Sequence, residues 1–507
     1  MKKFMAVFMA VVIMLTVAVP AFAQKGDVTP VIVVGGVGTR PYYQNGGTQD
    51  EIRVFPPTPD VAELVTIAAM GIVKTIVTRD SNCISEMVGK ILESVFEKFK
   101  CNADGDSKYE NVASVYYPLS IDNYEFDFYN EVPEVAIAGT VAQSIGAENT
   151  YFYNYDWRLD PCANAARLDK MIGQAKQKAG SDKVTLIPCS MGGVQTLAYL
   201  NEYGSDDIEK IIFMSSAHKG LLFVSEMFTG NIEFSQKNIF KYLSDFLNLG
   251  SEDIDDAFDM LCMYFGKAPY LALTFKIIDQ YAKKLNNETT YASLRRVFGS
   301  MPGMWAFVCD EYFDDARAFM TDETTSQALL DKIDYYHNNV GSRADDILLD
   351  AKENGVSICV FSHYNRGSIP VTPTANVEGD YLIETPCTSI GATVAFTGET
   401  LGDDYVQANY CGGHNHISPD RKIDASTCLF PDSTWFIKYE EHVGCKYGSD
   451  FAQLVKELND FDGQPTVFDF EKYPQFLKTD MKSMTLSPVT AKEPLTISGI
   501  LSSIFAS

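Results

Sequence analysis

Short apolar runs alternate with amphipathic stretches along much of this 507-residue chain. The apolar runs have the length of strands and are rich in β-branched residues, as in VIVVGG (31–36), VTLIP (184–188) and KIIFMSS (210–216). Between the first two, residues 165–180 place apolar side chains on one helical face and end at Gly180. This alternation predicts an α/β fold, in which helices flank a mostly parallel central sheet.

The pattern changes twice along the chain. Residues 221–345 contain helical patterns without a strand candidate, including an amphipathic helix expected at 251–266, so this segment is interpreted as a cap inserted into the core. After Gly463 the chain becomes polar and irregular. The expected organisation is therefore a core in two parts, a cap and a tail: 24–220, 346–463, 221–345 and 464–507.

The first 23 residues have the pattern of a cleaved secretory signal. Lys2 and Lys3 precede an apolar stretch that is broken by Pro20, and AFA stands before Gln24. We expect cleavage after Ala23 and a secreted or periplasmic mature protein. Removal of the two lysines would change the formal charge from −26 to −28. Such a charge disfavours binding to nucleic acid or to anionic membranes.

Eleven cysteines allow two interpretations in a secreted chain. Cys83 with Cys101, or Cys428 with Cys445, could close a surface loop as a disulfide. The alternative is that the cysteines are buried thiols, which is the commoner state of free cysteine.

Ser190 lies where the apolar run 184–188 meets a helical pattern that ends at Gly204. Its surroundings, PCSMG, match the nucleophile-elbow pattern G-x-S-x-G at Gly192, with Pro188 in place of the first glycine. The alternative is a serine that only caps the helix. Cys189 is a rival nucleophile, but Met191 would then occupy the position of the second glycine.

A nucleophilic serine needs a base, which in an α/β-hydrolase follows it in the order Ser, Asp, His. His442 comes directly after the apolar run WFIKY and is the expected base. His414 and His416 could ligate a metal with Cys411, although no further ligand stands out at a suitable spacing. His218 follows a strand and precedes the insertion, so it is expected to line the pocket rather than to act as base, and His337 and His363 have no motif around them.

The remaining parts of the expected site are an orienting acid and an oxyanion hole. Asp403 and Asp404 lie in a loop after the apolar run ATVAF, which is expected to be a further strand of the sheet, and this gives the required chain order. The backbone amide of Met191 should provide one oxyanion donor, and Val37, in the glycine-rich loop after the first strand, the other.

Several of these stretches together resemble the lecithin:cholesterol acyltransferase family of α/β-hydrolases. The resemblance rests on VIVVGGVGTR, NYDWRLDP, CSMGG, GDDYV and EEHV, in the family's order from about Val31 to Leu458. It implies Ser190 as nucleophile, Asp403 as acid because it follows Gly402, and His442 as base. It also implies that Trp157 and Arg158 shape the substrate pocket, although for Arg158 a buried ion pair in the core is the alternative.

These features together predict a secreted serine lipase, phospholipase or O-acyltransferase that needs no metal or organic cofactor. The expected substrate is a lipid or another hydrophobic ester, with transient contact between the cap and a lipid interface. No stable protein partner and no nucleic-acid partner are expected. The alternatives are a non-catalytic binding protein on a decayed hydrolase fold, and a thioesterase or peptidase on the same fold.

Overall fold

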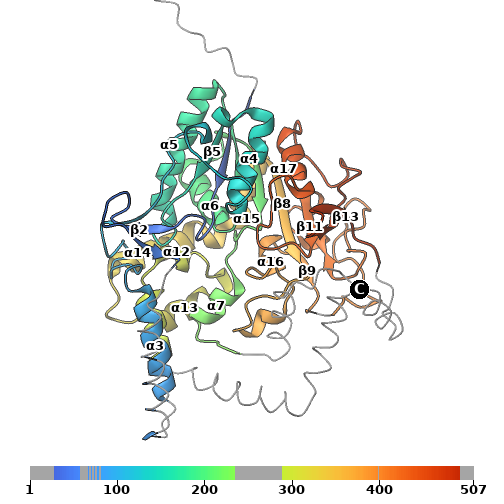
Figure 1. The fold of residues 1–507 in the computed structure, drawn as a ribbon. Coiled ribbons are helices and arrows are strands. Elements are labelled where there is room, and N and C mark those ends of the chain that lie inside the picture. The colour runs from blue at the N-terminus through green and yellow to red at the C-terminus, as the bar shows by residue number, and fades with distance from the viewer. Residues whose placement is uncertain are drawn as a thin grey trace, which may run out of the picture.

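The computed structural model describes residues 28–56, a few positions between 67 and 78, and residues 82–233, 288–397 and 399–491. The expected signal sequence and the expected helix at 251–266 lie outside these residues. An eight-stranded sheet in the order β13-β12-β11-β8-β7-β6-β1-β5 forms the centre of the molecule (Figure 1). All neighbouring strands are parallel except β12 and β13. The strands are β1 Val31–Val34, β5 Thr150–Tyr153, β6 Val184–Pro188, β7 Ile208–Met214, β8 Ser357–Tyr364, β11 Thr434–Lys438, β12 Phe476–Asp480 and β13 Thr485–Pro488.

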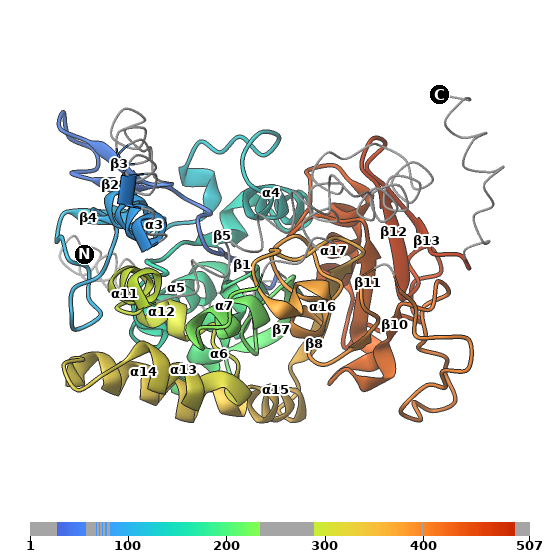
Figure 2. The same cartoon turned by 90° about the horizontal axis from the view of Figure 1, so that it is seen from below.

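Helices cover both faces of this sheet (Figure 2). On one face, α4 (Pro133–Ile145) and α17 (Asp450–Asp460) pack together over apolar side chains that include Val31 and Val33. On the other, α5 (Pro161–Ala179), α6 (Gly192–Tyr203) and α15 (Ala344–Glu353) pack over a second apolar cluster. Strands β1, β5, β6, β8 and β11 are buried along their whole length, which explains their continuous apolar sequences. The α/β prediction is confirmed, and the architecture is compatible with an α/β-hydrolase.

The described part of the expected cap is helical. It contains α7 (Leu222–Phe228), α11 (Glu288–Val297), α12 (Pro302–Trp305), α13 (Phe313–Met320) and α14 (Gln327–Asn339). Helices α7, α12 and α13 lie below the sheet in Figure 1 and in front of it in Figure 2. A small antiparallel sheet of β2 (Tyr42–Gln44), β3 (Ile52–Phe55) and β4 (Val112–Ser114), together with α3 (Asn82–Phe96), forms the adjoining region.

Two expectations about strands are wrong. The run ATVAF contributes only β9 (Thr393–Val394), which pairs with β10 (Ile423–Asp424) outside the main sheet. The segment after Gly463, expected to be an irregular tail, forms β12 and the edge strand β13. Only the first two residues of β12 and one residue of β13 are buried and apolar, so the sequence has no long apolar run there.

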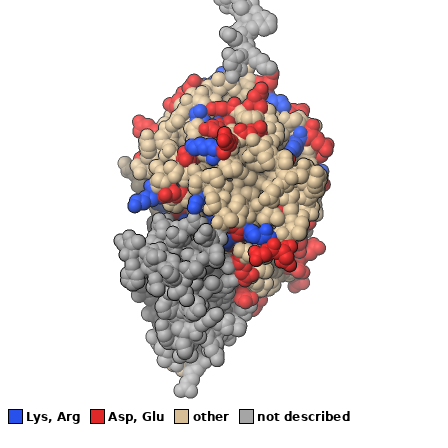
Figure 3. Space-filling view, turned by 90° about the vertical axis from the view of Figure 1, so that its right-hand side faces the viewer, with Lys and Arg blue, Asp and Glu red and all other residues tan. Residues whose placement is uncertain are grey.

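The surface and the thiols add two observations. Acidic side chains gather at several places on the face in Figure 3, as expected from the formal charge of −26. The ten cysteines among the described residues are all free, including both suggested disulfide pairs, so these are thiols.

Among the helices that the structure describes, none has the length and apolar character to cross a bilayer.

Candidate active site

Ser190 occupies a sharp turn between β6 and α6, with a backbone φ of 52°. A positive φ is strained for serine and is typical of a nucleophile elbow. The hydrogen bonds to both neighbouring strands continue into the turn. The amide of Cys189 donates to the Val34 carbonyl of β1, and the amide of Ser190 donates to the Met214 carbonyl of β7. Pro188 therefore ends the strand without distorting the elbow.

The glycines around Ser190 are required by close packing. A Cβ atom on Gly192 would lie 2.5 Å from the carbonyl oxygen of Val34, and one on Gly193 would lie 2.8 Å from Cβ of Ser216. On the other side, a Cβ on Gly36 would lie 2.7 Å from Cβ of Ser190. The loop after β1 thus approaches the serine so closely that a side chain has no space there.

Cys189 does not have the surroundings of a nucleophile. Its side chain is fully buried, and burial, with smaller effects of Glu134 and Cys445, raises the pKa of its thiol well above the usual value. The thiolate, which is the reactive form, is therefore disfavoured.

His442 lies in the loop after β11 and pairs with a buried carboxylate. Its Nδ1 lies 2.8 Å from Oδ2 of Asp380. Because a carboxylate accepts, Nδ1 donates, and a neutral imidazole then has its lone pair on Nε2. Within the described residues this buried Nε2 has no hydrogen-bond partner. The other oxygen of Asp380 accepts from the amides of Leu382 and Ile383, which fixes the carboxylate.

Opposing effects set the pKa of each partner. Burial lowers the pKa of His442, but the charge and hydrogen bond of Asp380, together with the charge of Glu134, raise it above its usual value. Burial raises the pKa of Asp380, yet the charge and hydrogen bond of His442 bring it below its usual value. Asp380 therefore stays ionised at neutral pH and favours protonation of His442.

The carboxylate beside His442 is thus Asp380, which corrects the expectation of Asp403. Asp403 is exposed, in a loop whose Gly402 carbonyl accepts from Arg421. The expectation of Asp403 depended on ATVAF being a strand of the main sheet. The strand of the main sheet that precedes Asp380 is β8. Asp380 directly follows Gly379, as Asp403 follows Gly402, so the same glycine-acid signal was present after VSICVFS.

A second carboxylate, Glu134, lies near both halves of the site. Thr39 Oγ1 accepts from the amide of Gly36 and donates to Oε1 of Glu134, each at 2.9 Å. Glu134 is 6% exposed and affects the pKa of both Cys189 and His442. Glu134 is therefore hydrogen-bonded to the loop after β1, and its charge acts on groups in the elbow and in the His442 loop. No sequence motif marked it.

The two expected oxyanion donors are each one residue away from the close contact between Gly36 and Ser190. Met191 follows the serine, and Val37 follows Gly36, which packs against Ser190. In the described part of the chain, neither amide donates to a backbone carbonyl. Both are therefore free of the backbone hydrogen-bond network.

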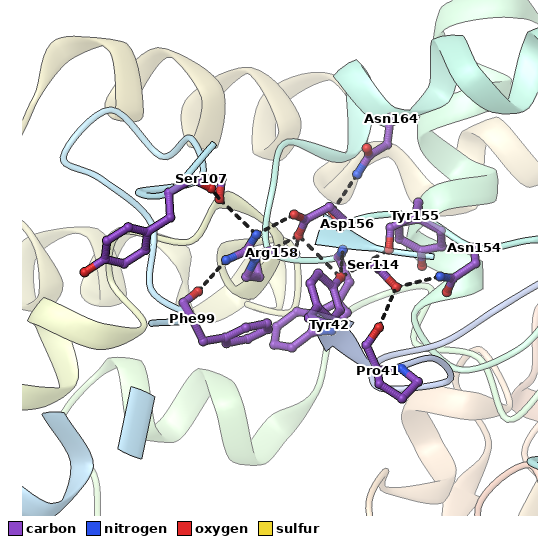
Figure 4. Close-up of polar contacts among 12 residues, drawn as sticks. Pro41, Tyr42, Phe99, Ser107, Ser114, Asn154, Tyr155, Asp156, Arg158 and Asn164 are labelled. Carbon is purple, nitrogen blue, oxygen red and sulfur yellow. Dashed lines mark hydrogen bonds and ion pairs between the residues drawn. The ribbon is translucent and has the colours of Figure 1, made fainter. Parts of the chain in front are cut away.

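Arg158 forms a buried ion pair, which is the alternative that the sequence left open for this residue (Figure 4). Its side chain is 0% exposed, and Nε and Nη2 donate to the two carboxylate oxygens of Asp156 at 2.9 and 2.6 Å. Nη1 donates to the carbonyl of Phe99. The bidentate pair therefore fixes the guanidinium within the segment after β5, and the bond to Phe99 ties this segment to the one after α3.

The neighbouring Trp157 is 5% exposed and packs on Phe55 and Phe99, with ring centroids 5.6 and 5.3 Å away. Its carbonyl lies against Gly303 of α12, where an added Cβ would also lie 3.0 Å from Cε of Met191. The cap thus contacts the elbow at this point.

Two other histidines are buried and neutral. Burial lowers the pKa of His218 to about 3 and of His363 to about 4. His363 Nδ1 donates to the carbonyl of Glu441, 2.8 Å away, and so holds the loop of His442. No sequence motif marked this positioning contact.

Comparison with known proteins adds little to this geometry. No family model and no curated relative matches the chain. Among solved structures, the chain is similar to the Tle4–Tli4 complex, with 10% identity, TM-score 0.31, and 85% of this chain and 98% of the other covered. It is also similar to a serine hydrolase from the polyaromatic-hydrocarbon-degrading bacterium Cycloclasticus zankles, with 13% identity, TM-score 0.13 and coverages of 38% and 72%. These scores are too low to support a function.

Proposed function

We propose that the protein is a serine ester hydrolase with Ser190 as nucleophile, His442 as base and Asp380 as orienting acid. The observation on which this depends most is the pair of His442 and Asp380 at 2.8 Å, with Nε2 of the histidine left without a partner. The strained φ of Ser190 supports the same role.

In this mechanism, Ser190 Oγ attacks the ester carbonyl and His442 Nε2 takes the serine proton. The amides of Val37 and Met191 donate to the carbonyl oxygen as it becomes negative. The tetrahedral intermediate then expels the alcohol, which receives the proton from His442. Water, or an acceptor alcohol in an acyltransferase, repeats these steps on the acyl-enzyme and releases Ser190.

The proposed substrate is a lipid or another hydrophobic ester, and the proposed location is outside the cytoplasm after removal of residues 1–23. The resemblance of the sequence motifs to the lecithin:cholesterol acyltransferase family supports the first point, and the N-terminal sequence pattern supports the second. The contact of α12 with Trp157 and Met191 supports a cap next to the acyl site. We further propose that this cap moves to admit the acyl chain.

A serine-reactive fluorophosphonate probe tests the nucleophile. We expect labelling of the wild type and of Cys189→Ala, and none of Ser190→Ala, with circular dichroism showing that all three are folded. A panel of esters of graded chain length, with a thioester and a peptide of matched acyl group, then tests the substrate class. No labelling of the folded wild type would favour a non-catalytic binding protein.

A further inference from the structure

A cluster of two histidines and an aspartate lies away from the proposed active site. His414 and His416 are in the loop between β9 and β10, and Asp432 is in the 3-10 turn Pro431–Ser433 directly before β11. One ligand atom from each residue lies within 4.8 Å of the others. His442 follows the other end of β11, so the cluster and the active site are at opposite ends of this strand.

The hydrogen bonds of Gln475 determine the proton position on His416. The Nε2 group of Gln475 donates to the carbonyls of Pro431 and Thr434, at 2.7 and 3.0 Å. Its Oε1 is therefore an acceptor, and Nδ1 of His416, 2.7 Å away, must donate to it. In the neutral imidazole the lone pair is then on Nε2.

Nε2 of His416 faces a second electron-pair donor. The side chain is 0% exposed, and its Nε2 lies 3.2 Å from Oδ1 of Asp432. Among the described residues this buried Nε2 makes no hydrogen bond. A neutral imidazole nitrogen and a carboxylate oxygen repel each other at this distance unless a cation lies between them. Two ligands of a tetrahedral zinc ion are separated by about 3.3 Å, because each is roughly 2.0 Å from the metal.

We propose that His414, His416 and Asp432 bind a Zn²⁺ ion, with water as the fourth ligand. Imidazole and carboxylate are ligands that suit this metal. Gln475 is the outer-shell partner that such a site needs, because it fixes the tautomer and the orientation of His416. His414 lies in the same loop, with its ring packed on Phe468 at a centroid distance of 4.2 Å.

The role of this ion is structural. It joins the loop between β9 and β10 to the start of β11. Gln475, the residue directly before β12, extends the connection to that strand. The ion therefore fixes the N-terminal end of β11, the strand whose other end leads into the His442 loop. This inference is independent of the proposed esterase activity, because none of the three ligands belongs to the Ser190 site.

Zinc binding to the full mature chain tests the proposal. The protein is treated with a chelator, dialysed and titrated with Zn²⁺ alone against a chromophoric competitor. We expect one Zn²⁺ per chain and an affinity at least about tenfold lower in His414→Ala and in Asp432→Asn. Both side chains are exposed, so neither change threatens folding. Zn²⁺ should also raise the Tm of the wild type by several degrees and leave that of the variants unchanged.

His337→Ala is the matched control. Nε2 of His337 lies 3.4 Å from Oδ1 of Asp310, but within the described residues no third ligand joins this pair. The control should bind Zn²⁺ as the wild type does. If Zn²⁺ neither binds nor changes the wild-type Tm, His416 and Asp432 form a plain ion pair and the proposal is wrong. Equal binding by wild type, His414→Ala and Asp432→Asn would place the metal elsewhere and overturn it as well.

Discussion

Gly36 and Ser190 are packed so closely that a methyl group on the glycine would lie 2.7 Å from Cβ of the serine and 3.2 Å from its Oγ. The loop after β1 and the elbow after β6 are adjacent because β1 and β6 are paired up to Val34 and Pro188. The site is thus assembled by the register of the parallel sheet, which brings the ends of neighbouring strands together.

The first prediction follows from this contact. Gly36→Ala should reduce probe labelling and ester hydrolysis about a hundredfold, because one of the two loops must move and a displacement of about 1 Å has costs of this order. Gly47→Ala is the control for a general effect of glycine replacement in the same region, since no atom lies within 4 Å of a Cβ there, although its positive φ gives a small loss of stability. Equal labelling of Gly36→Ala and wild type would show that the loop is not part of the site.

The second prediction distinguishes Asp380 from Asp403. Asp380→Asn should lower kcat roughly ten-thousandfold, as loss of the orienting carboxylate does in other triads, because the amide no longer favours the productive tautomer of His442. Asp403→Asn should leave kcat unchanged, because this side chain is exposed. Hydrolysis of a short-chain chromogenic ester measures both. A defect in the Asp403 variant alone would restore the expectation from sequence.

The difference between these two acids shows which parts of the site can be predicted from sequence. Ser190 sits in a local strand-turn-helix pattern, and His442 directly follows a continuous apolar strand, so both stand out. Asp380 is separated from His442 by 62 positions and is paired with it only by tertiary folding. Two Gly-Asp pairs lie in this region, and the apolar run before the second, which forms only the short strand β9, favoured Asp403. Most central strands were predictable because they are buried on both faces, whereas β12 depends on pairing with β11, and the edge strand β13 on pairing with β12.

The third prediction concerns the pH dependence of labelling. His442 must be neutral to accept the serine proton, and its pKa is raised, so the rate of labelling should fall as pH decreases through a midpoint above its usual value of about 6.5. Glu134→Gln removes one of the charges that raise this pKa and should move the midpoint to lower pH. Glu131→Gln is the control on the same segment, because Glu131 pairs with Arg40 and is not among the groups that affect His442. An unchanged midpoint in Glu134→Gln would remove Glu134 from the electrostatics of the site.

The fourth prediction separates a structural role of Arg158 from a substrate-binding one. Arg158→Leu should lower the free energy of unfolding by about 3–5 kcal/mol, because it leaves Asp156 without its buried partner. Arg317→Leu is the matched control: its pair with Asp334 is also bidentate, but it is partly exposed and should cost at most about 1 kcal/mol. Urea unfolding measures both. A raised KM with unchanged stability in Arg158→Leu would instead place this arginine in the substrate pocket.

The last prediction uses a buried carboxyl group beside the site. Glu384 is fully buried, one of its oxygens accepts from the amide of Leu222 at the start of α7, and burial raises its pKa to about 7. An unfolded chain has a glutamate pKa of about 4.3, so between this value and about 7 the folded state binds more protons than the unfolded state. The contribution of Glu384 to stability is therefore full below about pH 4.3 and decreases as pH rises to about 7. Glu384→Gln keeps an acceptor for Leu222 and removes the titration, so its free energy of unfolding should decrease less than that of the wild type over this interval. Urea unfolding at pH 5 and pH 7.5 provides the comparison, and parallel decreases in the two proteins would mean that Glu384 is ionised in the folded state.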